Sequence, residues 1–227
     1  MDDPMGFPPR KECVLIHHIK SIRTSGTIMP SSRYLVNRLV SGIDFARATD
    51  IVEFGIGTGC VTRELLRRMR PDARLISLEI NPAFVEVGRR IGDSRLTVRH
   101  SCASALPAVL AEEGIDRVDA VVSSLPLKIM DQDVVDRILD VSRECLRPDG
   151  RFVQYQYSLS HYKKLAARYA TVGVRFTARN TPPAFVYECT GTYGRAPQRV
   201  RLRPSVAAVY AGALAAAGMM IRAVQGN

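Results

Sequence analysis

Hydrophobic and polar positions follow two different periods between residues 50 and 191. Short and nearly continuous apolar runs, such as "DIVEF" at 50–54, indicate buried strands. Runs with apolar residues three and four apart, such as "TRELLRRM" at 62–69, indicate helices. The predicted strands span 50–54, 73–80, 95–101, the first part of 118–127, which ends in a turn, 150–158, 174–180 and 184–191. The predicted helices span 62–69, 81–91, 106–114, 132–146 and 161–173.

This alternation predicts an α/β fold with a mostly parallel sheet and helices on both of its faces. In the helix predicted at 81–91, Asn81 is suited to cap the first turn and Pro82 to occupy its first position. Ligands of such sheets bind at the carboxyl ends of the strands, so candidate chemistry is sought where the predicted strands end.

Composition and charge limit the classes of protein to which the chain can belong. The chain of 227 residues is long enough for one domain with a sizeable core, and its net charge of +10 favours an anionic partner unless it reflects only a well-solvated basic surface. Five widely spaced cysteines without a CxxC pair are typical of free thiols in a reducing compartment. Neither these cysteines nor the four histidines have the spacing of a metal site, so no metal is expected.

The stretch "VEFGIGTG" at 52–59 follows the first predicted strand. Glycines at Gly55, Gly57 and Gly59 allow a tight turn and a close approach of the backbone to a ligand. The third glycine comes one place too early for a dinucleotide-binding fingerprint. Glu53 precedes the glycines, and Glu79 ends the second predicted strand, where an acid can accept both hydroxyls of a ribose. The pattern therefore indicates a nucleoside ligand with a compact charged tail.

With these residues, "VEFGIGTG" and "LEINP" resemble the class I S-adenosylmethionine-dependent methyltransferases, which implies a Rossmann-like, seven-stranded fold. The resemblance implies that Glu53 orients the glycine loop and the methionine amino end, and that Glu79 binds the ribose. Where the family often has an acid for the adenine, this chain has Cys102, so adenine would be held around Cys102 and Ala103, or by Ser101 or Ser104. The predicted cofactor-binding residues are Glu53, Gly55, Gly57, Thr58, Gly59, Glu79, Ile80, Cys102, Ala103 and Ser123.

Further stretches make the resemblance more specific, and it then covers roughly residues 15–190. "SGTIMPSSRYLVNRLV" at 25–40, "SSLPLKIM" at 123–130 and "NTPPAFVYE" at 180–188 resemble the bacterial phospholipid N-methyltransferases, which convert phosphatidylethanolamine stepwise to phosphatidylcholine. The related rRNA adenine dimethyltransferases carry Asn-Leu-Pro-Tyr where this chain has Ser124-Leu125-Pro126-Leu127. The missing asparagine and aromatic side chain disfavour methylation of a base, which needs stacking and edge recognition.

Methyl transfer to an amine requires a neutral nitrogen, which costs roughly 4 kcal/mol at pH 7 for a group with the pKa of lysine. Desolvation and a neighbouring sulfonium lower that cost, and alignment supplies most of the rest. Carbonyl or hydroxyl groups at Ser123, Ser124 and Leu125 are the candidate acceptors for the amine. Aromatic faces suit a methylated cation. Tyr34 is the predicted aromatic residue of the active site, and Tyr155 and Tyr157 are also suitably placed.

Two terminal segments suggest contact with a membrane. Residues 11–23 combine an apolar helical face with basic residues, a pattern of an interfacial helix that could equally pack over the cofactor pocket. Residues 206–221 form an uncharged, alanine-rich run that falls short of a membrane span. The chain is therefore divided into an N-terminal helical segment (1–42), a catalytic domain (43–193) and a basic, alanine-rich extension (194–227).

These observations predict a cytoplasmic enzyme at the inner face of the cell membrane, with an anionic membrane surface as its partner and S-adenosylmethionine as its cofactor. RNA or small-molecule amine methylation on the same fold is the alternative enzyme function, in which phosphate contacts would explain the charge. A nucleoside-binding protein without catalysis is a third possibility.

Overall fold

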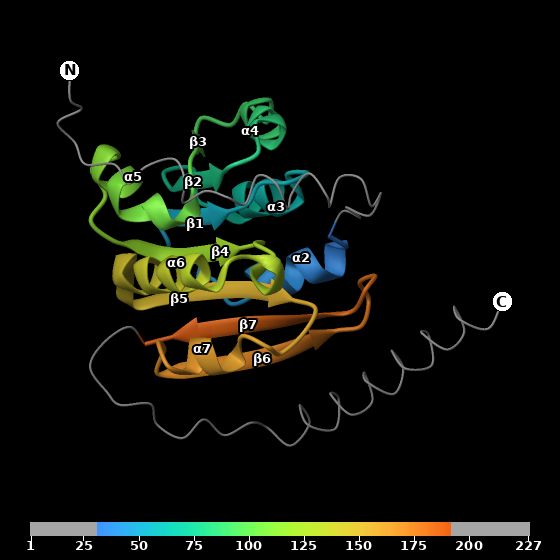
Figure 1. The fold of residues 1–227 in the computed structure, drawn as a ribbon. Coiled ribbons are helices and arrows are strands. Elements are labelled where there is room, and N and C mark those ends of the chain that lie inside the picture. The colour runs from blue at the N-terminus through green and yellow to red at the C-terminus, as the bar shows by residue number, and fades with distance from the viewer. Residues whose placement is uncertain (1–30, 192–227) are drawn as a thin grey trace.

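The computed structural model of the protein describes residues 31–191. In this range one seven-stranded sheet has the order β3-β2-β1-β4-β5-β7-β6 (Figure 1). β1 to β5 run parallel, whereas β7 is antiparallel to β5 and β6. The strands are β1 (Asp50–Phe54), β2 (Arg74–Glu79), β3 (Leu96–His100), β4 (Val118–Ser123), β5 (Leu146–Gln156), β6 (Thr171–Thr177) and β7 (Ala184–Thr190). The predicted Rossmann-like fold is confirmed.

Helices cover both faces of this sheet. The α-helices are α2 (Arg33–Val40), α3 (Cys60–Arg68), α4 (Pro82–Arg89), α5 (Leu106–Glu112), α6 (Gln132–Cys145) and α7 (Tyr162–Ala166), and short 3-10 turns form η2 (Ala103–Ala105) and η3 (Leu127–Ile129). The Asn81 side chain accepts a hydrogen bond from the Ala83 amide, so the predicted cap of α4 is confirmed. None of the helices in residues 31–191 is long and apolar enough to cross a membrane.

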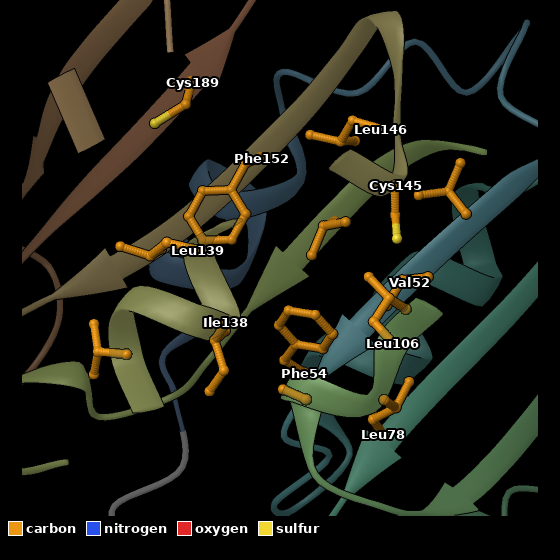
Figure 2. Close-up of a cluster of buried hydrophobic side chains, with 14 of the residues drawn as sticks. Val52, Phe54, Leu78, Leu106, Ile138, Leu139, Cys145, Leu146, Phe152 and Cys189 are labelled. Carbon is orange, nitrogen blue, oxygen red and sulfur yellow. The ribbon is translucent and has the colours of Figure 1, made fainter. Parts of the chain in front are cut away.

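The sheet separates two apolar clusters. One cluster joins Phe54 and Phe152 of the sheet to α5, α6 and α7, and Figure 2 shows how these rings face Ile138 and Leu139 of α6. The other cluster, on the opposite face, joins the sheet to α2 and α3. Because α2 lies within this second cluster, the described part of the predicted N-terminal segment packs as part of the catalytic core. The remainder of that segment, with residues 11–23, and the extension at 194–227 lie outside the described residues.

One predicted element is wrong in part. The helix expected at 161–173 ends at Ala166, and β6 begins at Thr171. Buried Tyr169 and Val172 fit the helical spacing, but the backbone from Thr171 onward pairs with β7 instead. The amide of Ala170 donates to the carbonyl of Gly191 just before that ladder starts. Pairing with a distant strand therefore overrides the local periodicity.

The topology brings the predicted site residues to one edge of the sheet. The carboxyl ends of β1, β2, β3, β4 and β5 lie together because these strands run parallel. The hairpin between β6 and β7 reaches the same edge, and Ser32 at the start of α2 is hydrogen-bonded to Asn180 in that hairpin (3.0 Å). This edge, at the right of Figure 1, is called the carboxyl edge below.

Candidate functional site

The glycine loop after β1 adopts a backbone that favours glycine. Gly55, Gly57 and Gly59 have φ values of 83°, 52° and 76°, in the left-handed region. A Cβ atom on Gly57 would meet no other atom within 4 Å, so the outer side of the loop is open to a ligand. Gly59 forms the N-cap of α3, and Thr58 beside it is exposed. The loop can therefore bring bare backbone against a ligand, as a nucleoside site of this fold requires.

Glu79, at the end of β2, fixes the conformation of this loop. Its Oε2 atom accepts hydrogen bonds from the amides of Ile56 (2.9 Å) and Gly57 (3.4 Å). Its Oε1 atom accepts one from the amide of Asn81 (2.8 Å). A carboxylate oxygen accepts about two hydrogen bonds, so Oε1 retains capacity for a hydroxyl donor. The predicted contact with a ribose is compatible with this geometry.

Glu53 is fully buried in β1, one strand away. Its carboxyl accepts hydrogen bonds from the hydroxyls of Thr62 (2.9 Å) and Ser77 (2.6 Å). Burial raises the pKa of Glu53 to about 7, although both hydroxyls favour the charged form and oppose that rise. The resemblance implied that Glu53 orients the glycine loop, whereas the hydrogen bonds to the loop amides come from Glu79. Glu53 instead ties β1 to α3 and β2 beneath the loop.

The residues expected near the adenine follow β3 at the same edge. Cys102 is half-buried and forms the N-cap of η2, and Ala103 is buried. The Ser104 hydroxyl donates to the Cys102 Sγ atom (3.1 Å). The carbonyl of Ile80, after β2, is hydrogen-bonded to the His100 ring (3.0 Å). The structure thus brings this corner next to Glu79, and its contacts with adenine remain a prediction.

The turn after β4 carries the predicted acceptors for the amine. Ser123 is buried, and its hydroxyl accepts a long hydrogen bond from the Leu125 amide (3.4 Å). The Leu125 carbonyl accepts hydrogen bonds from the side-chain amides of Gln154 (3.0 Å) and Gln156 (2.9 Å) and from the backbone amide of Leu127 (2.9 Å). A carbonyl oxygen has two lone pairs, so Leu125 has no acceptor left for a substrate. Its predicted role is therefore corrected, and half-buried Ser124 remains the candidate acceptor.

Gln154 and Gln156 are functional candidates that the sequence interpretation missed. Both are buried on the face of β5 that also carries Phe152. Glutamine at two alternating positions of a strand, on the same face as Phe152, is an unusual pattern, and that was the available signal. The Gln154 Oε1 atom is buried and has no hydrogen-bond partner among residues 31–191. The two side chains hold the turn after β4 in place.

Tyr34 has a different environment from the one expected. The guanidinium groups of Arg33 and Arg179 lie 4.9 and 5.0 Å from the centre of its ring. Arg33 also donates to its hydroxyl (3.0 Å), and this hydrogen bond and the charge of Arg33 lower the pKa of Tyr34. The ring thus contacts cations of the chain itself, in a basic pocket between α2 and β6. This geometry does not favour Tyr34 as the acceptor of a substrate cation.

Tyr155 and Tyr157, at the carboxyl end of β5, form an aromatic pair. Their ring centres are 5.8 Å apart and their planes are inclined by 72°. Tyr157 is 52% exposed, and its burial and the neighbouring Tyr155 raise the pKa of its phenol to about 12. The Tyr157 phenol is therefore neutral at physiological pH, and its exposed ring is the better placed of the candidates for a cation. In residues 31–191, no group of His, Cys, Asp and Glu side chains is arranged to hold a metal ion.

Comparisons with known proteins agree with this site. A family model described as a methyltransferase domain matches residues 51–150, from β1 to the first part of β5. The chain is 32% identical over 168 residues to the ornithine lipid N-methyltransferase of Singulisphaera acidiphila, and this match covers 73% of the chain and 88% of that protein. It is 35% identical over 95 residues to the ribosomal RNA small subunit methyltransferase H of Bordetella petrii, which covers 41% of this chain but only 26% of that protein.

A solved structure shows the same fold. The 1,6-didemethyltoxoflavin-N1-methyltransferase of Burkholderia thailandensis, with S-adenosylhomocysteine bound, superposes with a TM-score of 0.61 over 85% of this chain and 94% of that one. Its identity of 19% limits the likeness to the fold. The relative from Singulisphaera, in contrast, is matched over nearly its whole length. The chain therefore belongs to the class I S-adenosylmethionine-dependent methyltransferases.

Proposed function

We propose that this enzyme methylates the amine of a membrane lipid headgroup, with phosphatidylethanolamine as substrate on the route to phosphatidylcholine. The observation that carries the proposal is the match over 88% of a relative named as a lipid N-methyltransferase. That match extends over 168 residues, which is 73% of this chain, and so is longer than the 100 residues matched by the methyltransferase-domain model. The relative acts on an ornithine lipid, so an amine on a lipid is the shared chemistry.

The turn after β4 supports an aliphatic amine as the acceptor. Residues Ser124-Leu125-Pro126-Leu127 offer a hydroxyl and apolar side chains, without an aromatic ring for a base to stack on. Leu125 lies close to the glycine loop, since a Cβ atom on Gly55 would be 3.5 Å from its Cδ2 atom. An amine at this turn would be in an apolar environment, which favours the neutral, nucleophilic form.

When bound, S-adenosylmethionine supplies a methyl group on a sulfonium. The acceptor nitrogen must be neutral so that its lone pair can receive that methyl group, S-adenosylhomocysteine would be the other product, and the methylated ammonium must lose a proton before another transfer. We assign Ser124 to orient the amine, and Gln154 and Gln156 to hold the turn through Leu125. Glu53 is not the base, because its carboxyl is buried against Thr62 and Ser77. In this proposal the rate enhancement comes from the alignment and the desolvation of the acceptor amine.

The carboxyl edge has features that suit a membrane surface. The large hydrophobic side chains exposed in residues 31–191 are Tyr34, Ile129 and Tyr157, and all three belong to segments at this edge. Exposed Lys128 lies next to Ile129 in η3. Exposed apolar side chains next to basic ones are typical of proteins that dock on anionic bilayers. We therefore propose peripheral association with the inner face of the cell membrane.

Expression in a bacterial host that makes phosphatidylethanolamine but none of its methylated derivatives would test the proposal. We expect lipid extracts to contain phosphatidylethanolamine with added methyl groups, identified by mass spectrometry. A Glu79→Ala variant is the inactive control, and Glu86→Ala on exposed α4 is the matched control that should stay active. Unchanged lipids in cells that contain folded enzyme would contradict the proposal. If the enzyme instead methylates ornithine lipid in a host that makes this lipid, the substrate is still a lipid amine, but it is not phosphatidylethanolamine.

Methylation of RNA is the second candidate function, because the chain also resembles a ribosomal RNA methyltransferase over 95 residues. That match covers only about a quarter of the relative. It does not extend to the remaining length of that protein, so it supports the methyltransferase fold more than an RNA substrate. Methyl groups found in ribosomal RNA, with unchanged lipids, would favour this alternative.

A further inference from the structure

A basic pocket of about 540 Å³ lies between α2 and the edge strand β6. Helix α2 contributes Tyr34 and Arg38, and β6 with the hairpin after it contributes Arg175, Thr177 and Arg179. The pocket is separate from the glycine loop and from the turn after β4, since neither lines it. It is nevertheless linked to the carboxyl edge, where the hairpin and the start of α2 meet.

The pocket carries an excess of positive charge. Arg175 is paired with Glu188 of β7 (3.1 Å), and this is the carboxylate that faces it. Arg179 lies over the ring of Tyr34, which is a neutral partner. Arg38 makes no ion pair within residues 31–191 and is exposed. Among the described residues, the guanidinium groups of Arg38 and Arg179 are thus left without a carboxylate, and both can form the charge-assisted, bidentate hydrogen bonds that oxyanions accept.

A buried hydroxyl in the same pocket is an independent indication of a ligand. Thr177 is only 6% exposed, and its Oγ1 atom has no hydrogen-bond partner among residues 31–191. Buried polar atoms are nearly always satisfied, so an unpaired one in a pocket wall calls for a missing partner. An oxygen of a phosphate or carboxylate could accept its hydrogen.

The walls of the pocket are held in place by hydrogen bonds. The Ser32 hydroxyl donates to the carbonyl of Arg179 (2.7 Å), and the Ser32 amide donates to the Asn180 side chain (3.0 Å). On the other side, Arg68 of α3 donates to Asn37 of α2 (2.8 Å). Arg179 is therefore presented by a hairpin that is fixed to the helix carrying Arg38. Such preorganisation reduces the entropy that is lost on binding.

We propose that this pocket binds an oxyanion, a phosphate or a carboxylate, of a membrane lipid. The inference rests on the proposed function, because a lipid amine substrate carries such a group near its amine and anionic bilayers present many of them. Arg38 and Arg179 bind the oxyanion, Thr177 donates to it, and Tyr34 supports the guanidinium of Arg179. The pocket thus anchors the protein to the lipid surface beside the active site.

The test compares two double variants that lose the same charge. Arg38→Gln with Arg179→Gln changes the pocket. Arg47→Gln with Arg90→Gln changes two exposed arginines near the opposite edge, before β1 and after α4. Binding is measured by co-sedimentation with phosphatidylcholine vesicles that contain or lack phosphatidylglycerol. We expect the pocket variant to bind the anionic vesicles about thirtyfold more weakly than the wild type, and the control variant to bind nearly as the wild type does.

Further measurements separate the possible explanations. Affinity for S-adenosylhomocysteine should be unchanged in both variants, which shows that the fold and the cofactor site are intact. Thr177→Val, which keeps the charge, should weaken vesicle binding severalfold. Equal losses in the two double variants would overturn the proposal in favour of a general charge effect. Competition by inorganic phosphate at constant ionic strength should displace the vesicles. Phosphate binding to the pocket, without a selective loss of vesicle binding in its variant, would overturn the lipid assignment.

This test does not depend on turnover. If the pocket variant loses vesicle binding while no lipid is methylated by the wild type, the oxyanion site stands and the proposed reaction fails. If lipids are methylated while both double variants bind vesicles alike, the reaction stands and the pocket proposal fails.

Discussion

The two halves of the sheet carry opposite polar chemistry at the carboxyl edge. In the half built on β1, β2 and β3, carboxylates make the polar contacts, and Glu79 accepts hydrogen bonds from two amides of the glycine loop. In the half built on β4 to β7, glutamines hold the turn, tyrosines line the edge and arginines form a pocket. The acidic half suits a nucleoside with a cationic tail, whereas the other half suits an amine next to an oxyanion. Under the proposed function, this difference would let one edge bind two unlike molecules.

Replacing Glu79 tests the acidic half with the largest expected effect. Glu79→Ala removes the acceptor of three backbone amides as well as the predicted ribose contact. Hydrogen bonds to a charged group contribute about 1.5–3 kcal/mol each, so affinity for S-adenosylhomocysteine should fall about a hundredfold in calorimetry. Glu86→Ala is the control of equal charge on exposed α4. Unchanged affinity in the Glu79 variant would mean that the loop and the ribose are held by other groups.

Glu53 should make the stability of the protein depend on pH. The pKa of Glu53 is raised to about 7 in the folded state from 4.5, so the folded protein keeps a proton that the unfolded chain loses. The free energy of unfolding therefore falls by about 3 kcal/mol as the pH rises from about 5 to about 8. Glu53→Gln should remove this part of the pH dependence in urea denaturation.

The partly buried residue Glu64 provides the control for that experiment. Hydrogen bonds from Arg67 and Arg68 lower the pKa of Glu64 to about 2, despite its partial burial. Its contribution to stability is present above pH 4.5 and is lost only as the pH falls towards 2. Glu64→Gln should therefore leave the slope between about pH 5 and pH 8 unchanged. An unchanged slope in Glu53→Gln would contradict the account of the buried carboxyl.

The glutamines of β5 test the other half with a smaller effect. Gln156→Leu removes one of the three donors to the Leu125 carbonyl and loosens the turn that carries Ser124. We expect kcat to fall about tenfold, since misplacing a reacting group by a fraction of an ångström is costly. Affinity for S-adenosylhomocysteine should not change, because the cofactor half is untouched. A loss of cofactor affinity equal to the loss of kcat would show that the two halves are not independent.

Replacing Tyr157 should have the smallest effect of these substitutions. An exposed cation–π contact contributes about 0.5–1 kcal/mol, so Tyr157→Leu should raise the KM for monomethylated lipid about threefold. Tyr157→Phe keeps the aromatic face and should behave as the wild type does. If the Phe variant loses as much as the Leu variant, the hydroxyl rather than the ring is the group that matters.

The sequence predicted the acidic half better than the other one, for a physical reason. The glycine loop, Asn81 and the buried strands depend on local backbone preferences, and these are visible as residue types at fixed spacing. The contacts of Leu125 depend on its backbone carbonyl and on two side chains from β5, far along the chain. Likewise, residues 171–173 have a helical pattern in the sequence but form part of β6, because they pair with β7. Contacts made by backbone atoms and by distant strands have no local signature.

The most direct measurement offers labelled S-adenosylmethionine and purified enzyme either phosphatidylethanolamine vesicles or ribosomal RNA, in parallel. We expect label in methylated phosphatidylethanolamine, a rate that rises when the vesicles contain anionic lipid, and no label in RNA. Glu79→Ala, assayed under the same conditions, should give no labelled lipid. Label in RNA, or an enzyme that binds S-adenosylhomocysteine yet leaves every lipid amine unlabelled, would contradict the central claim.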